Sequence, residues 1–144
     1  MFLRIPPLLF IFSLIFMYLT PVYYPFKLSP LVSLFFLTLG IIIAISSLSL
    51  FIKNKANISP LDLNNTTYLI DTGIYRYTRN PMYLSLLLIL IAYFFYLENL
   101  LSFWGILFYY FMTTHFQIKK EEKHLLKQFG NQYQAYMHKV GRWI

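Results

Sequence analysis

The stretch LSPLVSLFFLTLGIIIAISSLSLFI, residues 28–52, has no charged side chain and indicates the class of fold. A helix needs about 20 apolar residues, within a range of about 17 to 25, to cross the hydrocarbon core of a bilayer. Three further uncharged stretches reach this length, at residues 5–26, 80–97 and 99–118. The sequence therefore predicts an all-α integral membrane bundle with about four transmembrane helices.

The composition favours the same class. Hydrophobic residues make up 58% of the 144 residues and charged residues only 12%, whereas soluble domains carry about 25% charged residues. A soluble core of this size could not bury so much apolar surface, so we expect one membrane domain over residues 1–144. The absence of cysteine excludes disulfides, thiolate nucleophiles and zinc–sulfur sites.

The basic residues predict the orientation of these spans. Eleven of the twelve Lys and Arg residues fall in the N-terminus, the 53–79 loop or the 119–144 tail, and Lys27 alone falls on the other side. The eleven are Arg4, Lys53, Lys55, Arg76, Arg79, Lys119, Lys120, Lys123, Lys127, Lys139 and Arg142. By the positive-inside rule, the loop, the tail and both termini are cytoplasmic, and the connections after the first and third spans are short. Because these charges flank apolar runs, we expect membrane lipids rather than nucleic acid as partners.

The segment DTGIYRYTRNPMYLS, residues 71–85, contains a predicted helix start. Asn80 is a favoured N-cap residue and Pro81 suits the first helical position. The free N–H groups of this helix end, with Arg76 and Arg79 beside them, would suit a carboxylate or phosphate. A capped helix with snorkelling arginines at the membrane interface is the alternative.

The tail, residues 116–144, is predicted to form an amphipathic interfacial helix. On a helical wheel Leu125 and Phe129 lie within about 20° of Ile118, and four lysines occupy one flank. Glu122 falls near the middle of the apolar face, with Glu121 at its edge. A carboxylate there is costly unless paired, so we expect a loop arginine, a ligand hydroxyl or a ligand cation as its partner. A surface ion pair with Lys119 is the alternative interpretation.

The three histidines, His115, His124 and His138, have no familiar metal-ligand spacing, so no metal site is predicted. His115 ends the fourth span and is placed to touch a ligand, although an interfacial histidine without that role is the simpler interpretation.

Two of these segments carry a family resemblance. The run R-N-P-M-Y, then one more span, then E-E-x-x-L-x-x-x-F-G-x-x-Y-x-x-Y and a terminal R-W resembles the isoprenylcysteine carboxyl methyltransferase and phospholipid methyltransferase superfamily. The resemblance covers roughly Gly73 to the C-terminus. The matching residues are Arg79, Asn80, Pro81, Met82, Tyr83, Glu121, Glu122, Leu125, Phe129, Gly130, Tyr133, Tyr136, Arg142 and Trp143.

The resemblance implies a membrane methyltransferase that uses S-adenosylmethionine and a lipid-like or prenylated acceptor, with carboxyl methylation of an isoprenylcysteine-type substrate favoured. The sequence departs from the family pattern at two positions. Asn80 stands where histidine is commoner, and Ser85 stands where glycine is usual. Asparagine at this position resembles bacterial members, so the expected location is a bacterial inner membrane. The implied catalytic residues are Glu122, Arg79 and Tyr83, and the implied cofactor-binding residues are Arg79, Asn80, Pro81, Tyr83, Glu121, Glu122 and His115.

Two other functions are compatible with the same sequence. Sterol-reductase-like membrane oxidoreductases, which use NADPH, resemble the same C-terminal region. A membrane module without enzymatic activity, whose basic tail binds anionic lipid, is the third possibility. Within the methyltransferase hypothesis, an amine or hydroxyl acceptor would need a general base, and Glu121, Glu122 and Tyr83 are the candidates.

Overall fold

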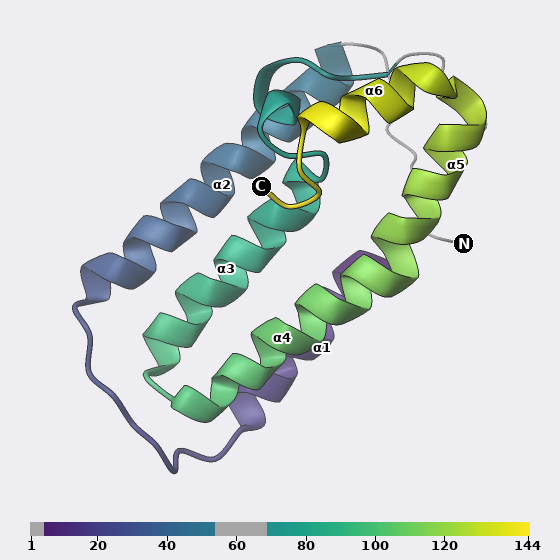
Figure 1. The fold of residues 1–144 in the computed structure, drawn as a ribbon. Helices are drawn as coiled ribbons and strands as arrows, with labels where there is room; N and C mark the ends of the chain where they lie inside the picture. The colour runs from purple at the N-terminus through teal and green to yellow at the C-terminus, as the bar shows by residue number, and fades with distance from the viewer. Residues whose placement is uncertain (1–4, 54–68) are drawn as a thin grey trace.

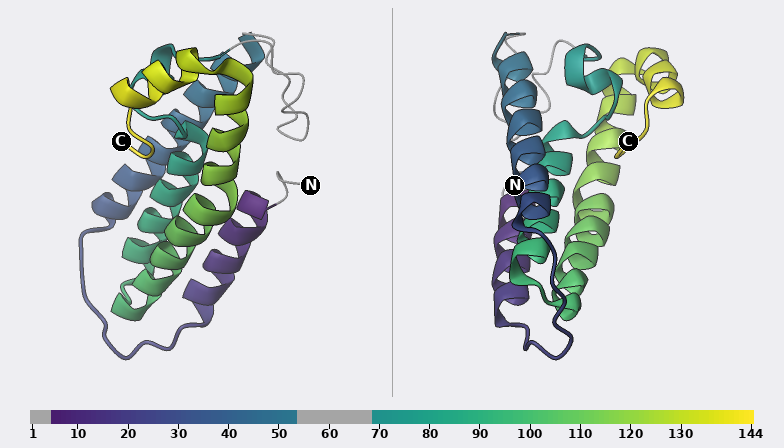
Figure 2. Two further views of the ribbon diagram at one scale, coloured as in Figure 1. Left: turned by 45° about the vertical axis from the view of Figure 1, so that its right-hand side comes forward. Right: turned by 90° about the vertical axis from the view of Figure 1, so that its left-hand side faces the viewer.

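The chain is all-helical in a computed structural model that describes residues 5–53 and 69–144, and no β-strand occurs among these residues. Four rods run side by side (Figures 1 and 2). They are built on α1 (Ile5–Leu19), α2 (Pro30–Lys53), α3 (Pro81–Leu97) and α4 (Phe103–Thr113). Helix α2 packs along α3, and α1 packs against α4. The predicted helical class is confirmed.

Helix α2 is the one helix among the described residues that is long and apolar enough, at 24 residues, to cross a membrane. Helices α1 and α3 are apolar but have only 15 and 17 residues. The predicted second and third spans agree with α2 and α3 to within two residues. The four-span arrangement stays a prediction.

The first predicted span, residues 5–26, is too long. Helix α1 ends at Leu19 and residues 20–29 form an irregular connector, so the short connection expected after the first span is wrong. Thr20 precedes Pro21, and a proline disfavours the helical conformation in the residue before it. The connector is fastened instead to the turn after α3, where Phe26 N–H donates to the Glu98 carbonyl at 3.0 Å and Leu100 N–H to the Tyr24 carbonyl at 3.0 Å.

Helices α2 and α3 approach closely at Gly40. A Cβ on Gly40 would lie 3.0 Å from the carbonyl oxygen of Ser85, so only glycine fits without a shift of the backbone. Ser85 itself is buried and donates its hydroxyl to the Met82 carbonyl at 2.7 Å. Gly40 therefore allows α2 to approach the backbone of α3 at Ser85.

The fourth rod continues beyond the predicted end of its span. The 3₁₀ turn η4 (Leu100–Ser102), α4, the π-helical segment η5 (Thr114–Ile118) and α5 (Lys119–Phe129) follow one another without a break (Figure 1). The tail then turns at Gly130 into α6 (Asn131–Lys139), so it forms two helices rather than the single one predicted. Gly130 has φ of 51°, a conformation that residues with a Cβ rarely adopt.

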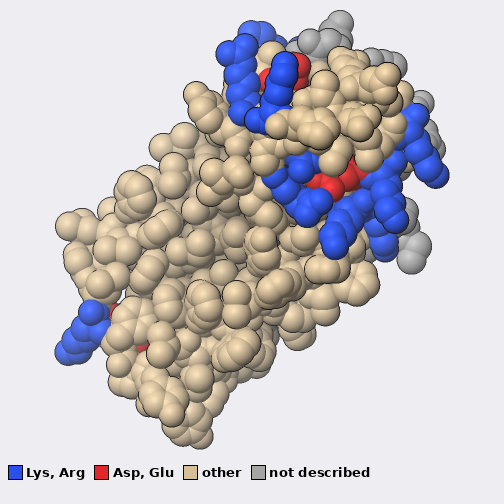
Figure 3. Space-filling view, in the orientation of Figure 1, with Lys and Arg blue, Asp and Glu red and all other residues tan. Residues whose placement is uncertain are grey.

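The elements that carry the charged residues meet at one end of the bundle. The 3₁₀ turn η3 (Gly73–Arg76) packs on α2, and the last residues of the chain fold back from α6 toward α3. Trp143 packs on Tyr110 with ring centroids 5.1 Å apart. Figure 3 shows most of the blue surface gathered at this end of the bundle, with a small blue patch at the opposite end. Among the described residues every Lys and Arg except Lys27 belongs to the first group, whereas Arg4, Lys55 and most of the predicted 53–79 loop lie outside the described residues.

Candidate functional site

The start of α3 forms one wall of the site. Pro81 occupies the first helical position, as predicted, but the side chain of Asn80 makes no capping hydrogen bond. Asn80 Nδ2 instead donates to the carbonyl of Arg142 at 2.9 Å, and Arg79 N–H donates to the carbonyl of Gly141 at 3.1 Å. Asn80 occupies the N-cap position, as predicted, but its side chain does not cap the helix, because the C-terminal segment, distant in sequence, offers the amide a partner. Asn80 therefore ties the C-terminus to the helix start.

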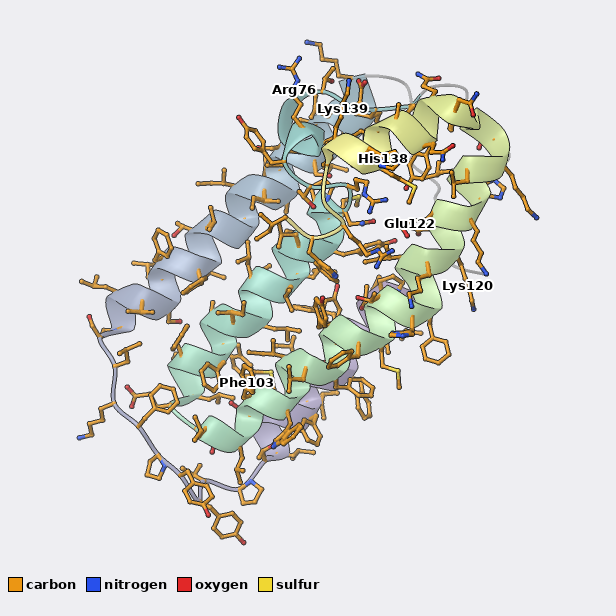
Figure 4. The ribbon with its side chains drawn as sticks, viewed as in Figure 1. Arg76, Phe103, Lys120, Glu122, His138 and Lys139 are labelled. Carbon is orange, nitrogen blue, oxygen red and sulfur yellow. The ribbon has the colours of Figure 1, made fainter. Side chains whose placement is uncertain are left out.

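Glu122 forms the centre of the site. It is only 6% exposed, and it faces inward from α5 (Figure 4). Arg142 donates Nε to Oε1 at 2.9 Å and Nη2 to Oε2 at 2.7 Å, and Arg79 Nη1 lies 2.9 Å from Oε1. A buried carboxylate is destabilising by several kcal/mol unless it is paired in this way. The partner expected for Glu122 is present, and a second arginine, which the sequence did not predict as a partner, completes the pairing.

Arg79 has hydrogen-bonding capacity left over. Its side chain is 8% exposed. Nη1 is paired with Glu122, whereas the buried Nε makes no hydrogen bond of normal geometry. Two guanidinium groups share the single carboxylate of Glu122, so positive charge exceeds negative charge in this cluster. The excess lies beside the first turn of α3, whose backbone N–H groups have no partner within the helix. The arrangement can bind an anionic group.

Glu121 lies next to this cluster and has a different environment. Its Oε1 accepts a hydrogen bond from Tyr83 Oη at 2.7 Å and a second one from Gln117 Nε2. Burial raises the pKa of Glu121 above its usual range, the two donors oppose the shift, and the charge of Glu122 adds to it. The site thus holds one carboxylate locked between arginines and one that can take up a proton more easily.

Aromatic side chains close the site on the side of α6. Tyr133 is 2% exposed, and its pKa is raised by burial and by Glu122, against the opposing effect of Arg79. Tyr136 donates its hydroxyl to the carbonyl of Tyr75 at 2.6 Å, which joins α6 to η3. Burial raises the pKa of Tyr75 to about 12, and Ser47 of α2 hydrogen-bonds its hydroxyl at 3.0 Å. These contacts join α6, η3 and α2 at the end of the bundle that holds the cluster, in which Glu122 and Arg79 are buried and Arg142 is partly exposed.

Six of the seven predicted cofactor-binding residues meet in this region: Arg79, Asn80, Pro81, Tyr83, Glu121 and Glu122. The seventh, His115, does not join them. It is exposed, and its Nδ1 contacts the carbonyl of Phe111 at 3.0 Å on its own helix. Arg76 is exposed at the end of η3 and is also outside the cluster (Figure 4).

Sequence reasoning missed Gln117 and the role of Arg142. Arg142 belongs to the R-W pair of the resemblance, but nothing in the sequence shows that the C-terminus folds back on α3. Gln117 lies in the predicted span of residues 99–118, and an amide side chain in such a span is a signal that could have been used. The structure shows that Gln117 is fully buried.

The fold and the site define an all-helical protein with a buried cluster of charged side chains at one end of the bundle. Residues 28–132 match the family model described as phospholipid methyltransferase, so the chain belongs to this family. The family is part of the isoprenylcysteine/phospholipid methyltransferase superfamily, and the resemblance drawn from the sequence is confirmed. It points to methyltransferase activity in general, and to membrane association.

A curated relative adds no functional detail. An uncharacterized protein of Haemophilus influenzae is 44% identical over 63 residues, which is 44% of this chain and all of the relative. No solved structure matches the chain with statistical significance. Arg142, Tyr133 and Tyr136 lie beyond the residues that the family model matches.

Proposed function

We propose that this protein is a membrane methyltransferase that transfers a methyl group from S-adenosylmethionine to a lipid-like acceptor. The cofactor would lie between the start of α3 and α5. The observation that carries the proposal is the buried carboxylate of Glu122 between Arg79 and Arg142, beside the Nε of Arg79, which makes no hydrogen bond of normal geometry. A cluster with a spare buried donor is poorly explained as a structural ion pair, since burial without partners is destabilising.

The residues present fit this cofactor. Its carboxylate would meet the Nε of Arg79, which makes no hydrogen bond of normal geometry, and the free amides of the α3 first turn. Its amino group and ribose hydroxyls would meet Glu122 and the buried Oε1 of Gln117, which has no hydrogen-bond partner of normal geometry. When bound, S-adenosylmethionine supplies an electrophilic methyl group on a sulfonium.

The protein's own contribution is orientation, exclusion of water and proton handling. Arg79 and Glu122 hold fixed charges in a buried position, so they can align a charged ligand without rearrangement. Tyr83 and Glu121 share a hydrogen bond and can hold the proton that an amine or hydroxyl acceptor releases. The tyrosines of α6 exclude water. Glu122, Arg79 and Tyr83 remain the catalytic residues that we predict, with Glu121 added as the proton acceptor.

We propose that the bundle crosses a bacterial inner membrane four times, with both termini on the basic, cytoplasmic side. Exposed aromatic side chains near the opposite end suit the other membrane interface. They are Tyr18, Tyr23, Tyr24, Tyr96 and Trp104. The irregular connector at that end, residues 20–29, has backbone hydrogen bonds to the turn after α3. Irregular backbone at membrane depth needs such partners, because lipid offers no hydrogen bonds.

The acceptor is lipid-like in this proposal, because the site lies at the end of an apolar bundle. The family match leaves the head group of the acceptor open, so the isoprenylcysteine-type carboxylate stays a prediction.

Titration of the purified full-length protein with S-adenosylhomocysteine tests the function. We expect saturable binding at micromolar concentration, lost in Arg79→Gln and kept in Arg76→Gln, its exposed control at the same end. Membranes given labelled methyl donor should then yield a methylated lipid by mass spectrometry only when the protein is present. The absence of both results would refute the proposal, and binding of NADPH in their place would favour the reductase alternative.

A further inference from the structure

The last residues of the chain, 140–144, reach the charged cluster without regular secondary structure, folding back from α6 toward the start of α3 (Figure 1). The side chain of Arg142 in this segment is 34% exposed, whereas those of Arg79 and Glu122 are buried. A long side chain on irregular backbone loses conformational entropy when it is held in one geometry. The two hydrogen bonds from Arg142 to Glu122 therefore need contacts that hold the segment in place.

The start of α3 holds the segment on one side. Arg79 N–H and Asn80 Nδ2 donate to the carbonyls of Gly141 and Arg142. Both acceptors are backbone groups, so these bonds fix the course of the chain as far as the Arg142 carbonyl. The contacts beyond that point are made by the next residue, Trp143.

Trp143 holds the segment on the other side, against the fourth rod. Its Nε1 donates to Thr114 Oγ1 at 3.2 Å, and its ring packs on that of Tyr110 with the planes tilted by 31°. Thr114 is 7% exposed and donates its own hydroxyl proton to the Tyr110 carbonyl at 2.7 Å. The Thr114 oxygen is thereby left as an acceptor, which suits an indole N–H, because that group can only donate. Trp143 is thus anchored to the first residue of η5.

A tryptophan near a membrane interface has a simpler role as an interfacial anchor. Such a residue buries its ring and turns its N–H toward water or lipid head groups. The N–H of Trp143 is bonded instead to a buried hydroxyl, and its ring packs against the cluster of Ile43, Leu84 and Leu88 on α2 and α3. Trp143 therefore points into the bundle, which an interfacial anchor does not require.

The π-helical turn brings Thr114 and Glu122 to nearly the same face of the fourth rod. In a regular α-helix, the eight steps from Thr114 to Glu122 would rotate about 80° beyond two whole turns. The wider turn of η5 absorbs about one residue, which reduces this offset to about 20°. The two residues then lie about 12 Å apart along one face. Arg142 and Trp143, which are neighbours in sequence, contact one each.

We propose that Trp143 and Thr114 are positioning residues, whose hydrogen bond fixes the C-terminal segment so that Arg142 meets both carboxylate oxygens of Glu122. The inference rests on the proposed function, in which Glu122 aligns the cofactor. Because the pair acts only through Arg142, its loss should weaken ligand binding without adding to the loss of Arg142 itself. A residue that merely stabilises the fold would not show this dependence.

The first test observes Arg142 directly and needs no ligand. The chain has four arginines, so full-length protein labelled with 15N-arginine in detergent micelles gives few Nε–H signals, and Arg142→Lys identifies that of Arg142. In the wild type the Arg142 Nε–H is bonded to Glu122 and should exchange slowly with water. We expect Thr114→Val and Trp143→Phe each to accelerate this exchange about five- to tenfold, the effect of one lost hydrogen bond. Thr114→Ser keeps the hydroxyl and should restore slow exchange.

The second test is titration of the same variants with S-adenosylhomocysteine. Thr114→Val should weaken binding about five- to tenfold, and Thr114→Ser should bind within about twofold of wild type. In the Arg142→Lys background, Thr114→Val should weaken binding by no more than about a further twofold, because neighbouring residues that act together are not additive. Losses that simply multiply would give Thr114 a separate role and would overturn the inference.

The matched controls are Thr38→Val and Trp104→Phe. Thr38 also donates to a carbonyl four residues earlier, that of Leu34, but it is exposed on α2, and Trp104 is exposed at the other end of the bundle. Neither control should change the exchange of Arg142 Nε–H or the ligand affinity.

The two tests separate the inference from the proposed function. Unchanged Arg142 exchange in folded Thr114→Val, or in Trp143→Phe where the first variant does not fold, would overturn the inference. Equal affinity of the wild type and Thr114→Val for S-adenosylhomocysteine would overturn it as well. If the exchange accelerates as expected but the wild type does not bind S-adenosylhomocysteine, the positioning of Arg142 stands and the proposed function fails.

Discussion

The two ends of the bundle both bury polar side chains, but they satisfy them differently. At the end away from the charges, Asn99 is 2% exposed and every polar atom of its side chain has a partner. Its Nδ2 donates to the carbonyls of Thr20 at 3.2 Å and Pro21 at 3.3 Å, and its Oδ1 accepts from Leu101 N–H at 3.3 Å. At the charged end Glu122 is paired, yet its partner Arg79 keeps a buried Nε that makes no hydrogen bond of normal geometry.

This difference separates a structural polar group from a candidate binding group. Asn99 is neutral, and its bonds go to backbone groups that would otherwise be unsatisfied, so it closes the connector onto the turn after α3. The Glu122 cluster joins three ionised side chains with a spare buried donor, an arrangement that gains from a further charged ligand. Mutation of the two ends should therefore separate stability from binding.

The largest effect is expected from Glu122→Gln. The variant leaves two arginines facing a neutral amide, and breaking a buried ion pair costs about 3–5 kcal/mol. We expect the free energy of unfolding in detergent to fall by about this amount, and S-adenosylhomocysteine affinity to fall at least about a hundredfold. Denaturant titration and ligand titration measure the two quantities.

The control for this variant is Glu98→Gln at the other end. Glu98 Oε1 accepts a hydrogen bond from Leu28 N–H at 3.1 Å, and a glutamine retains that acceptor. Its unfolding free energy should change by no more than about 0.5 kcal/mol. Equal effects of the two variants would contradict the contrast between the ends.

The second prediction concerns Asn99→Ala. The change leaves two carbonyls and one N–H without their partner, so we expect a loss of roughly 2–3 kcal/mol in unfolding free energy. Because Asn99 is distant from the cluster, S-adenosylhomocysteine affinity should stay within about twofold of wild type. A large loss of affinity together with normal stability would show that this end also belongs to the site.

A smaller effect is expected from Arg142→Lys. Lysine keeps the charge but cannot donate two parallel hydrogen bonds to the Glu122 carboxylate. We expect about tenfold weaker S-adenosylhomocysteine binding, which corresponds to about 1.4 kcal/mol. Arg76→Lys, an exposed site at the same end, is the matched control and should bind as wild type does.

The smallest predicted effect is a dependence of stability on pH through Glu121. Its pKa is raised in the folded state, so between the ordinary glutamate pKa and the raised value the folded protein binds more protons than the unfolded one. Stability from this group is complete below the ordinary pKa, near 4.3, and is lost as the pH rises through the raised value. Glu121→Gln should remove this decline in a series of thermal unfolding midpoints. An unchanged pH profile in the variant would assign the decline to other groups.

Sequence patterns predicted the helices best where a single local property decides them. Uncharged length located α2 and α3, and Pro81 marked the start of α3. The end of α1 was missed because the apolar run continues past Thr20, whereas the proline that follows breaks the helix. The division of the tail at Gly130 was missed because an amphipathic pattern does not show which glycine adopts a positive φ.

The sequence by itself determined the helical class, the segregation of charge and the need of Glu122 for a partner. These follow from apolar length, from the position of the basic residues and from the cost of burying a carboxylate, and none of them needs a contact to be known. Only the tertiary structure decided which arginines pair with Glu122, that Asn80 binds the C-terminal segment, and that His115 faces outward. Those outcomes depend on how the C-terminus folds back and on the extra residue in the π-helical turn, and neither has a local signal in the sequence.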